Sequence, residues 1–196
     1  MMPADAIEQG WLNYAERRPS ANFNQRPDPT DISLLVIHNI SLPPGQFGDS
    51  CVERLFGNQL DWSEHPFFET IRGITVSAHL FIRRDGQVLQ FVPFHERAWH
   101  AGQSQFLGRA NCNDFSIGIE LEGTDDTPYE AAQYDQLTRI TRLLLAQYPA
   151  LAPDRIVGHS DIAPGRKTDP GPHFDWAGYR AALSQFPAGT TPTWSA

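Results

Sequence analysis

Residues 32–38 read Ile-Ser-Leu-Leu-Val-Ile-His, an apolar run of strand length that ends at a histidine. A continuous apolar run of this kind is typical of a strand that is buried on both faces of a sheet. A second short run, residues 155–158, ends in the same way at His159. Functional side chains concentrate on loops at strand ends, because a rigid sheet positions them. These stretches predict a central sheet and indicate His38 and His159 as candidate site residues.

Two further stretches add strands to this sheet. Residues 76–83 and 87–93 flank Asp85-Gly86, a pair that favours a hairpin with a type I′ turn because such turns need positive φ. Residues 115–122 alternate, with apolar side chains on one face and small or acidic side chains on the other. This alternation predicts a strand with one face in the core.

Helical spacing of apolar residues appears three times after the first strand. The stretches are residues 51–60, with Ser50 as cap, residues 127–148, and residues 174–183. In the longest, Thr127 to Glu130 fits a capping box with proline at the first helical position. We therefore expect one α/β domain, in which a central mixed β-sheet is flanked by helices.

The charge balance limits the partners that the chain can bind. The net charge is -8 and the pI is about 5.2, whereas nucleic acids and anionic membranes are usually met by clustered Lys and Arg. No apolar stretch has the length of a membrane span. We therefore expect neither nucleic acid nor a membrane as partner. Among the 15 basic residues only Lys167 is a lysine, and an ammonium and a guanidinium do different chemistry, so Lys167 is a candidate functional residue.

The two strand-end histidines are suitable metal ligands. Neutral imidazole binds zinc well, and a catalytic zinc takes three protein ligands and keeps one position open. A third ligand is available in the loop after His159, where Asp161, Asp169 and His173 are all chemically possible. Spacing alone does not choose among them, although Pro170 restricts Asp169 to extended geometry in a stiff loop.

Glu120 lies on the non-core face of its predicted strand, beside the small residues Ser116 and Gly118. It is either a solvated carboxylate on an edge face or a general base in a cleft. In the second case Lys167 would stabilise the oxyanion of a tetrahedral intermediate. Trp99, in a predicted loop, would either pack in the core or form a stacking wall for a sugar.

Six motifs, in order, resemble those of the type 2 N-acetylmuramoyl-L-alanine amidases, which share their fold with phage T7-type amidases and peptidoglycan recognition proteins. Within that family the likeness is to the AmpD branch, the 1,6-anhydro-N-acetylmuramyl-L-alanine amidases. The motifs span most of residues 10–180: LVIHNISLPPG (35–45), VSAH (76–79), IRRDG (82–86), RAWHAG (97–102), CNDFSIGIELEG (112–123), and GHSDIAP (158–164) continuing through RKTDPGP (166–172).

The resemblance implies a function and a site. It implies hydrolysis of the amide bond between the lactyl group of (1,6-anhydro-)N-acetylmuramic acid and L-Ala of the stem peptide, on a small muropeptide returned from the cell wall. It implies one Zn²⁺ per chain and no obligate protein partner. The implied residues are His38, His159 and Asp169 for the metal, Glu120 and Lys167 for catalysis, and Asn39 and Arg109 for substrate. Trp99 joins the substrate candidates on its own chemistry, as a stacking wall for a sugar. T7-type amidases and recognition proteins have cysteine as third ligand, where this chain has Asp169.

Two other functions share this fold. One is an amidase that acts on intact peptidoglycan, and the other is a peptidoglycan-binding module without catalysis; the full set of ligands with Glu120 and Lys167 argues against the latter. We expect residues 1–30 to form an irregular lead-in, 31–186 the amidase domain, and 187–196 a disordered tail. The first 14 residues lack a basic start followed by an apolar run, so the expected location is the cytoplasm.

Overall fold

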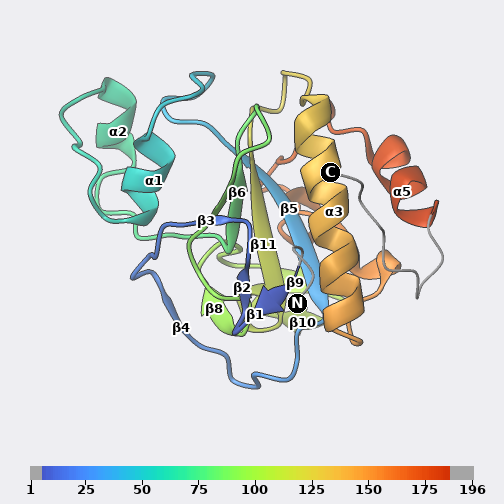
Figure 1. Cartoon of the computed structure of the whole chain (residues 1–196). Helices are drawn as coiled ribbons and strands as arrows, with labels where there is room; N and C mark the ends of the chain where they lie inside the picture. Colours follow the sequence, from blue (N-terminus) through green and yellow to red (C-terminus); the bar gives the residue numbers. More distant parts are fainter. Residues whose placement is uncertain (1–5, 186–196) are drawn as a thin grey trace.

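The structure is a computed structural model that describes residues 6–185. A sheet in the order β12-β5-β11-β6-β7-β3 forms the centre, and helices lie on both of its faces (Figure 1). The strands of this sheet are β3 (Glu16–Arg17), β5 (Leu34–Ile40), β6 (Leu80–Ile82), β7 (Val88–Gln90), β11 (Ser116–Glu122) and β12 (Ile156–Gly158). Only β6 and β7 pair antiparallel; the other neighbours are parallel. The predicted α/β domain with a mixed sheet is confirmed.

Within residues 6–185, five α-helices and several short elements surround the sheet. The helices are α1 (Cys51–Phe56), α2 (Pro66–Thr70), α3 (Ala131–Gln147), α4 (His159–Ile162) and α5 (Trp176–Ser184). Small two-stranded sheets pair β1 (Ile7–Glu8) with β2 (Trp11–Leu12), β4 (Phe23–Gln25) with β8 (Glu96–Ala98), and β9 (Gln105–Phe106) with β10 (Arg109–Ala110). The 3₁₀-helices are η1 (Cys112–Asp114) and η2 (Pro153–Arg155). None of the helices in the described part of the chain has the length and apolar character needed to cross a membrane.

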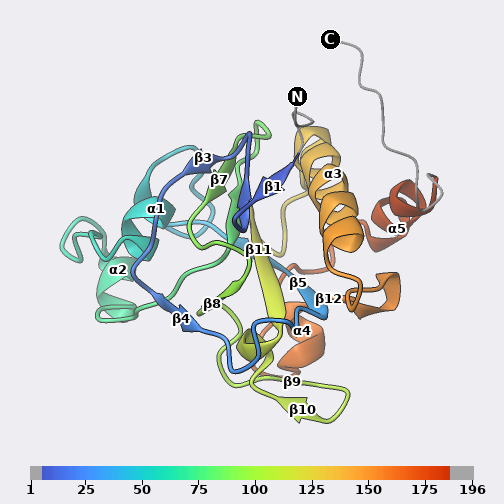
Figure 2. The ribbon, with the colours of Figure 1, turned by 60° about the horizontal axis from the view of Figure 1, so that its bottom comes forward.

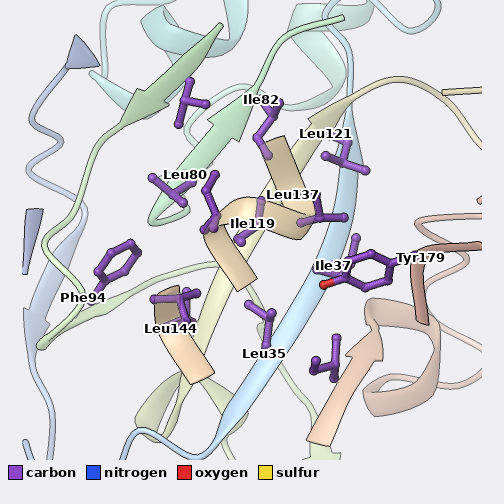
Figure 3. Packing of buried hydrophobic residues seen from close by; sticks show 14 of the residues in the cluster. Leu35, Ile37, Leu80, Ile82, Phe94, Ile119, Leu121, Leu137, Leu144 and Tyr179 are labelled. Carbon is purple, nitrogen blue, oxygen red and sulfur yellow. The ribbon is translucent and has the colours of Figure 1, made fainter. Parts of the chain in front are cut away.

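The main core lies between the sheet and helices α3 and α5 (Figure 3). Leu35 and Ile37 of β5 face it, together with alternate residues of β11, and Leu144 of α3 packs onto them. The opposite face of β5 carries Leu34 and Val36, which pack against α4 in a separate cluster. Because side chains alternate along a strand, His38 lies on the face of Leu34 and Val36. The site described below is therefore on the side of the sheet away from α3.

Strand β5 begins later and continues further than the sequence predicted. It starts at Leu34 and runs through Ile40, so His38 and Asn39 lie within the strand and not after it. The reason is pairing with β11, whose register with β5 extends as far as Ile40, whereas β12 pairs with β5 only as far as Ile37. The strand after residue 155 does end as expected, because His159 is the first residue of α4.

The hairpin between β6 and β7 is present, but its predicted type I′ turn is wrong. Gly86 has a φ of 87°, and no positive φ is found at Asp85. The Gly86 N–H donates to the carbonyl of Arg83, and the Arg83 N–H donates to that of Gln87. Residues 84–86 thus form a three-residue loop in which glycine supplies the single left-handed position, another common solution for a hairpin.

The ends of the helices also differ from the prediction. Helix α3 begins at Ala131, and the Glu130 N–H donates to Gln133 Oε1 over 3.0 Å. Thr127, the predicted cap, instead bonds to Thr124 through their hydroxyl groups. A capping box between Glu130 and Gln133 forms instead, three residues further along the chain. It is favoured because Gln133 is buried and donates to the carbonyls of Ile82 and Glu122 in the sheet. Helix α1 ends at Phe56, earlier than predicted.

The stretch expected to be an irregular lead-in contributes short strands between residues 6 and 30. Strand β3 adds an edge to the central sheet, and β4 runs antiparallel to β8 along the side of the molecule (Figure 2). Arg26 is buried and donates to the carbonyl oxygens of Phe94 and Ser116. These strands of residues 6–30 have only two or three residues and no apolar run or alternation, so backbone pairing reveals them. The tail predicted from residue 187 lies outside the described residues.

Candidate metal centre

Three side chains from separate elements meet on the α4 side of the sheet. His38 comes from β5, His159 begins α4 directly after β12, and Asp169 follows in the next loop. His38 Nδ1 lies 3.0 Å from His159 Nδ1 and 3.1 Å from Asp169 Oδ2, and the last two atoms are 3.0 Å apart. These residues form a group that can hold a metal ion. Parallel pairing of β5 with β12 brings the two histidines together, because both strands run toward the same edge.

The loop that carries Asp169 is fixed by its neighbours. The Ser160 N–H donates to the Asp169 carbonyl over 3.0 Å, and the hydroxyl of Tyr129 donates to the Pro170 carbonyl over 2.7 Å. Gly171 has a φ of 79°, and a Cβ there would lie 2.4 Å from Asp125 Cα. Only glycine therefore allows the loop to pass this close to Asp125.

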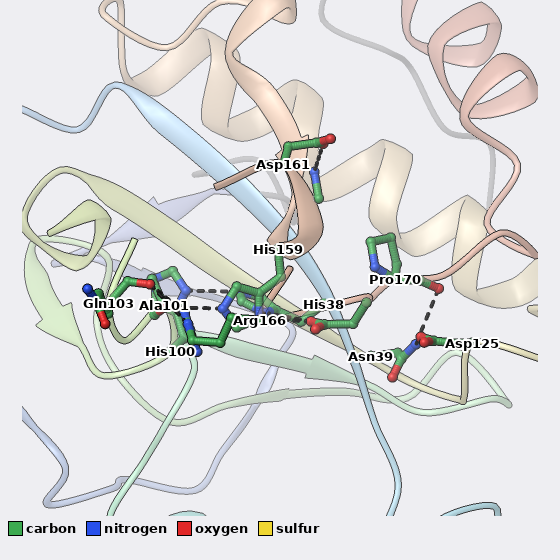
Figure 4. A network of polar contacts seen from close by, with 12 residues as sticks. His38, Asn39, His100, Ala101, Gln103, Asp125, His159, Asp161, Arg166 and Pro170 are labelled. Carbon is green, nitrogen blue, oxygen red and sulfur yellow. Dashed lines mark hydrogen bonds and ion pairs between the residues drawn. The ribbon is translucent and has the colours of Figure 1, made fainter. Parts of the chain in front are cut away.

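The other two candidates for a third ligand lie elsewhere. Asp161 Oδ2 accepts a hydrogen bond of 2.7 Å from the Gly158 N–H at the start of α4, and its side chain points away from His38 (Figure 4). His173 is exposed and does not belong to the group that can hold a metal. The geometry thus brings Asp169, and neither of the alternatives, to the two histidines.

The electrostatics of the group favour a divalent cation. Burial lowers the pKa of His38 to about 4, despite its hydrogen bond to Asp169. Burial acts to raise the pKa of Asp169, but hydrogen bonds from His159 and His38 outweigh it and hold this pKa below its ordinary value. Near neutral pH the site therefore presents a neutral imidazole at His38 and an ionised carboxylate. Two nitrogens and one carboxylate oxygen are a donor set that zinc accepts, with a fourth position left for solvent or substrate.

Glu120 stands beside His38 in the neighbouring strand. The two Cα atoms are partners in the parallel β11–β5 register, so both side chains are on the same face. Glu120 is buried, and its Oε2 has no hydrogen-bond partner within residues 6–185. Burial raises the pKa of Glu120 well above its usual value, the charge of Asp169 raises it further, and Lys167 lowers it. The interpretation of Glu120 as a solvated carboxylate on an edge face is wrong, because β11 is an inner strand.

The opposite face of β11 also needs one correction. Ile117, Ile119 and Leu121 face the main core as predicted, but Phe115 does not. Phe115 precedes the strand and packs with Leu34 on the α4 side. It ends η1 with a ψ of 10°, which is not an extended conformation, so the alternation does not extend to it.

Lys167 is exposed and makes no ion pair with any of residues 6–185. Its backbone N–H donates to the Ala163 carbonyl over 3.0 Å, which places it in the turn after α4. Its positive charge lowers the pKa of both His38 and Glu120. The ammonium group is therefore close enough to act on the electric field of the site without being bound to either residue.

The three residues expected to contact substrate have partners within the protein. Asn39 Nδ2 donates to Asp125 Oδ1 over 2.8 Å and to the Pro170 carbonyl over 3.2 Å. Trp99 Nε1 donates to Asn24 Oδ1 over 2.7 Å. Arg109 pairs with Asp31 at 2.7 Å, and its guanidinium carbon lies 3.8 Å from the centre of the Phe115 ring. No hydrogen bond joins Trp99 or Arg109 to the His38 group within the described part of the chain.

Sequence reasoning missed the residues behind the two histidines. His38 Nε2 lies 2.9 Å from His100 Nδ1, and His159 Nε2 lies 3.1 Å from the Ala101 carbonyl oxygen (Figure 4). Arg166 also donates to that carbonyl, over 2.7 Å. The only signal in the sequence was the RAWHAG motif, which carries the resemblance but says nothing about contacts.

Comparison with known proteins shows the class to which this fold and this group of side chains belong. A model of the N-acetylmuramoyl-L-alanine amidase family matches residues 28–172. The chain therefore belongs to the N-acetylmuramoyl-L-alanine amidase family.

Its similarity to particular members is high. The chain is 56% identical to the 1,6-anhydro-N-acetylmuramyl-L-alanine amidase AmpD of Escherichia coli strain K12, over 91% of this chain and 97% of that protein. The crystal structure of a selenomethionine AmpD derivative superposes with a TM-score of 0.88 at 54% identity, covering 91% of this chain and 99% of the other. The amidase AmiD of E. coli, solved in complex with anhydro-N-acetylmuramic acid-L-Ala-D-γ-Glu-L-Lys, gives a TM-score of 0.57 at 32% identity, covering 78% and 57%.

Proposed function

We propose that this chain is a zinc-dependent amidase that hydrolyses the bond between the lactyl group of 1,6-anhydro-N-acetylmuramic acid and L-Ala of the stem peptide. The convergence of the donor atoms of His38, His159 and Asp169 within about 3 Å of one another carries the proposal. The printed activity of the AmpD relatives supports the substrate, since the similarity extends over most of both chains. We assign catalysis to residues 31–186.

The residues fit a catalytic zinc better than a structural one. Structural sites usually fill four positions with cysteine and histidine, whereas this group offers three ligands. The buried, unpartnered Oε2 of Glu120 on the adjacent strand is a further sign of a site built for a ligand. A bound zinc ion would polarise the scissile carbonyl and lower the pKa of water.

Glu120 and Lys167 would carry out the proton transfer and the stabilisation of the oxyanion. Glu120, with its raised pKa, is basic enough to take a proton from the attacking water and to return it to the amine of L-Ala that leaves. Lys167 has no competing ion pair within residues 6–185 and stabilises the negative oxygen of the tetrahedral intermediate.

The substrate would be a small muropeptide, and the setting would be cytoplasmic recycling of cell-wall fragments. We retain Asn39, Trp99 and Arg109 as candidate substrate contacts. The half-exposed Trp99 precedes His100, and Arg109 leaves half of its side chain exposed. Their partners Asn24 and Asp31 would hold these side chains in place before substrate arrives.

The test is mass spectrometry of an anhydro-muramyl tripeptide after incubation with the full chain. We expect free anhydro-sugar and free peptide, no cleavage after treatment with a chelator, and recovery on addition of zinc. Asp169→Ala should be inactive, while His173→Ala, which alters an exposed histidine near the same loop, should retain activity.

Other outcomes would identify the alternatives. If the zinc-loaded protein bound the tripeptide without cleaving it, the chain would be a peptidoglycan-binding module and not an amidase. Faster release of peptide from polymeric peptidoglycan than from the tripeptide would indicate an amidase that acts on the intact wall.

A further inference from the structure

The two histidines of the metal group are held from behind by consecutive residues. His100 Nδ1 lies 2.9 Å from His38 Nε2, and the Ala101 carbonyl oxygen lies 3.1 Å from His159 Nε2. On the opposite edges of both rings, the Nδ1 atoms face Asp169 Oδ2. A single short segment therefore contacts the far nitrogen of each ring.

With a metal ion bound, each histidine would need a lone pair on Nδ1 and its proton on Nε2. A carbonyl oxygen only accepts, so the Ala101 carbonyl suits a proton on His159 Nε2. For His38 to keep the same lone pair, its Nε2–H must donate to His100 Nδ1. His100 then carries its proton on Nε2, where Ser116 Oγ lies at 3.1 Å as acceptor. The row of hydrogen bonds from His38 through His100 to Ser116 thus has a donor and an acceptor at each contact.

The segment is itself fixed on several sides. Asn113 Oδ1 accepts from the backbone N–H groups of His100, over 3.1 Å, and Ala101, over 2.8 Å. Arg166 Nη2 donates to the carbonyls of Ala101 and Gln103. The His100 ring lies directly over Gly118, where a Cβ would be 2.4 Å from Cγ of the ring. Gly118 therefore provides the space in which the imidazole reaches His38.

We propose that His100 and Ala101 are positioning residues, which orient His38 and His159 so that both Nδ1 lone pairs point at one metal ion. The inference rests on the metal binding proposed above and extends it to residues that do not touch the metal. Partners of this kind fix ring orientation and tautomer, and their loss typically costs about 10–100-fold in metal affinity.

The experiment is a zinc titration of the full chain against a competing chelator. His100→Leu preserves an apolar volume but removes the hydrogen bond, and the Kd for zinc should rise about 10–100-fold. His100→Asn places an amide oxygen near the position of Nδ1 and should recover much of this loss. The control is His79→Leu, because His79 is also buried and its ring centre lies 5.8 Å from that of His100, yet it contacts neither His38 nor His159; its Kd should stay near wild type.

A spectroscopic readout separates positioning from general damage to the fold. Nitrogen-15 NMR of the zinc-loaded protein should show hydrogen-bonded, slowly exchanging Nε2–H groups on both His38 and His159. In zinc-loaded His100→Leu the His38 Nε2–H should shift and exchange faster, while that of His159 should be unchanged because Ala101 still accepts its proton.

Each result of the zinc titration and of the NMR measurement either supports or overturns the proposed role of His100. A zinc Kd within twofold of wild type in His100→Leu, or a His38 Nε2–H resonance that does not change, would overturn the inference. Should His100→Leu not fold, Ser116→Ala replaces it: it leaves the buried Nε2–H of His100 without its acceptor, and an unchanged Kd would again overturn the proposal. Failure of the wild-type chain to bind zinc, or equal binding by Asp169→Ala, would instead refute the proposed metal centre itself.

Discussion

Glu120 differs from the other acidic groups of the site in what surrounds it. Asp169 accepts hydrogen bonds from two histidines, which hold its pKa low, whereas Glu120 is buried with an unpartnered oxygen and a raised pKa. Two carboxylates whose environments shift their pKa values in opposite directions are suited to different tasks. Asp169 suits a metal, and Glu120 suits proton transfer.

Replacing Glu120 by glutamine should separate these tasks. The amide has nearly the same shape but takes no proton, so we expect kcat for the anhydro-muramyl tripeptide to fall about 10²-fold or more. Zinc affinity should stay near wild type, because Glu120 is not in the metal-holding group. The control is Glu64→Gln, which alters a surface ion pair with Arg54. A kcat within a few-fold of wild type would remove Glu120 from the mechanism.

Lys167→Ala should also reduce kcat by about 10²-fold, because the oxyanion loses its cation. The effect on KM should be smaller if the charge acts mainly in the transition state. Steady-state kinetics of the zinc-loaded variant measure both constants. An exposed arginine on α5 offers the control: Arg180→Ala should leave kcat unchanged.

Buried His79 should make the metal-free protein sensitive to acid. Its Nδ1 accepts from the Gly118 N–H, and burial, followed by the charge of Arg26, lowers its pKa to about 3. The unfolded chain takes up a proton below about pH 6.5, whereas the folded state does not until about pH 3. The free energy of unfolding should thus fall as pH drops through this window, by about 1.4 kcal/mol per pH unit for this histidine.

Urea unfolding of the metal-free protein at pH 7, 6 and 5 measures this slope. His79→Asn keeps an acceptor near Nδ1 but cannot titrate, so its slope should be shallower than that of wild type. Leu107→Ala, at a leucine that is 77% exposed and does not titrate, should leave the slope unchanged. Equal slopes for wild type and His79→Asn would contradict the assignment.

Helix α3 stabilises the sheet that carries the site without contributing a ligand. Its buried residues Leu137, Ile140 and Leu144 pack against β5 and β11 on the face opposite His38. The helix therefore supports the site through the sheet. Truncation within it should lower stability while leaving the chemistry of the folded protein intact.

Leu144→Ala should cost about 2–5 kcal/mol in the free energy of unfolding, because Leu144 is fully buried and the cavity would not close completely. Its matched control is Leu107→Ala, at a leucine that is 77% exposed, with an expected change below about 0.5 kcal/mol. Urea denaturation measures both. Similar losses in the two variants would show that α3 is not a principal part of the core.

For the whole molecule, the metal group connects segments that are far apart in the chain. His38 and Asp169 are separated by 131 positions, so an ion between them would join β5 to the loop after α4. Binding to the folded state alone adds about 2.7 kcal/mol at a ligand concentration of 100 times Kd.

Zinc should therefore raise the Tm of the metal-free protein by about 5–10 °C at such a concentration. Thermal unfolding by circular dichroism, with and without zinc, measures the shift. Asp169→Ala should show little or none of it. A shift of equal size in Asp169→Ala would indicate that zinc binds elsewhere.

The sequence by itself determined most strands of the central sheet, the longer helices and most of the chemical candidates. An apolar run indicates that a single strand is buried. The strands β5 and β12 could therefore be predicted, with His38 and His159 near their ends. The alternation of residues 115–122 identified the face that carries Glu120, and the rare lysine drew attention to Lys167. These signals are local, because each depends on side chains that neighbour one another in the chain.

Only the tertiary structure decided which candidates meet. Spacing alone left Asp161, Asp169 and His173 open, and the path of the loop past Tyr129 and Asp125 brings Asp169 to the two histidines. His100 gave no signal of a role, because its contact with His38 depends on the loop passing over Gly118 in a neighbouring strand. The order of strands and the course of loops determine such contacts. The periodicity of a single element predicts neither, because it depends only on side chains within that element.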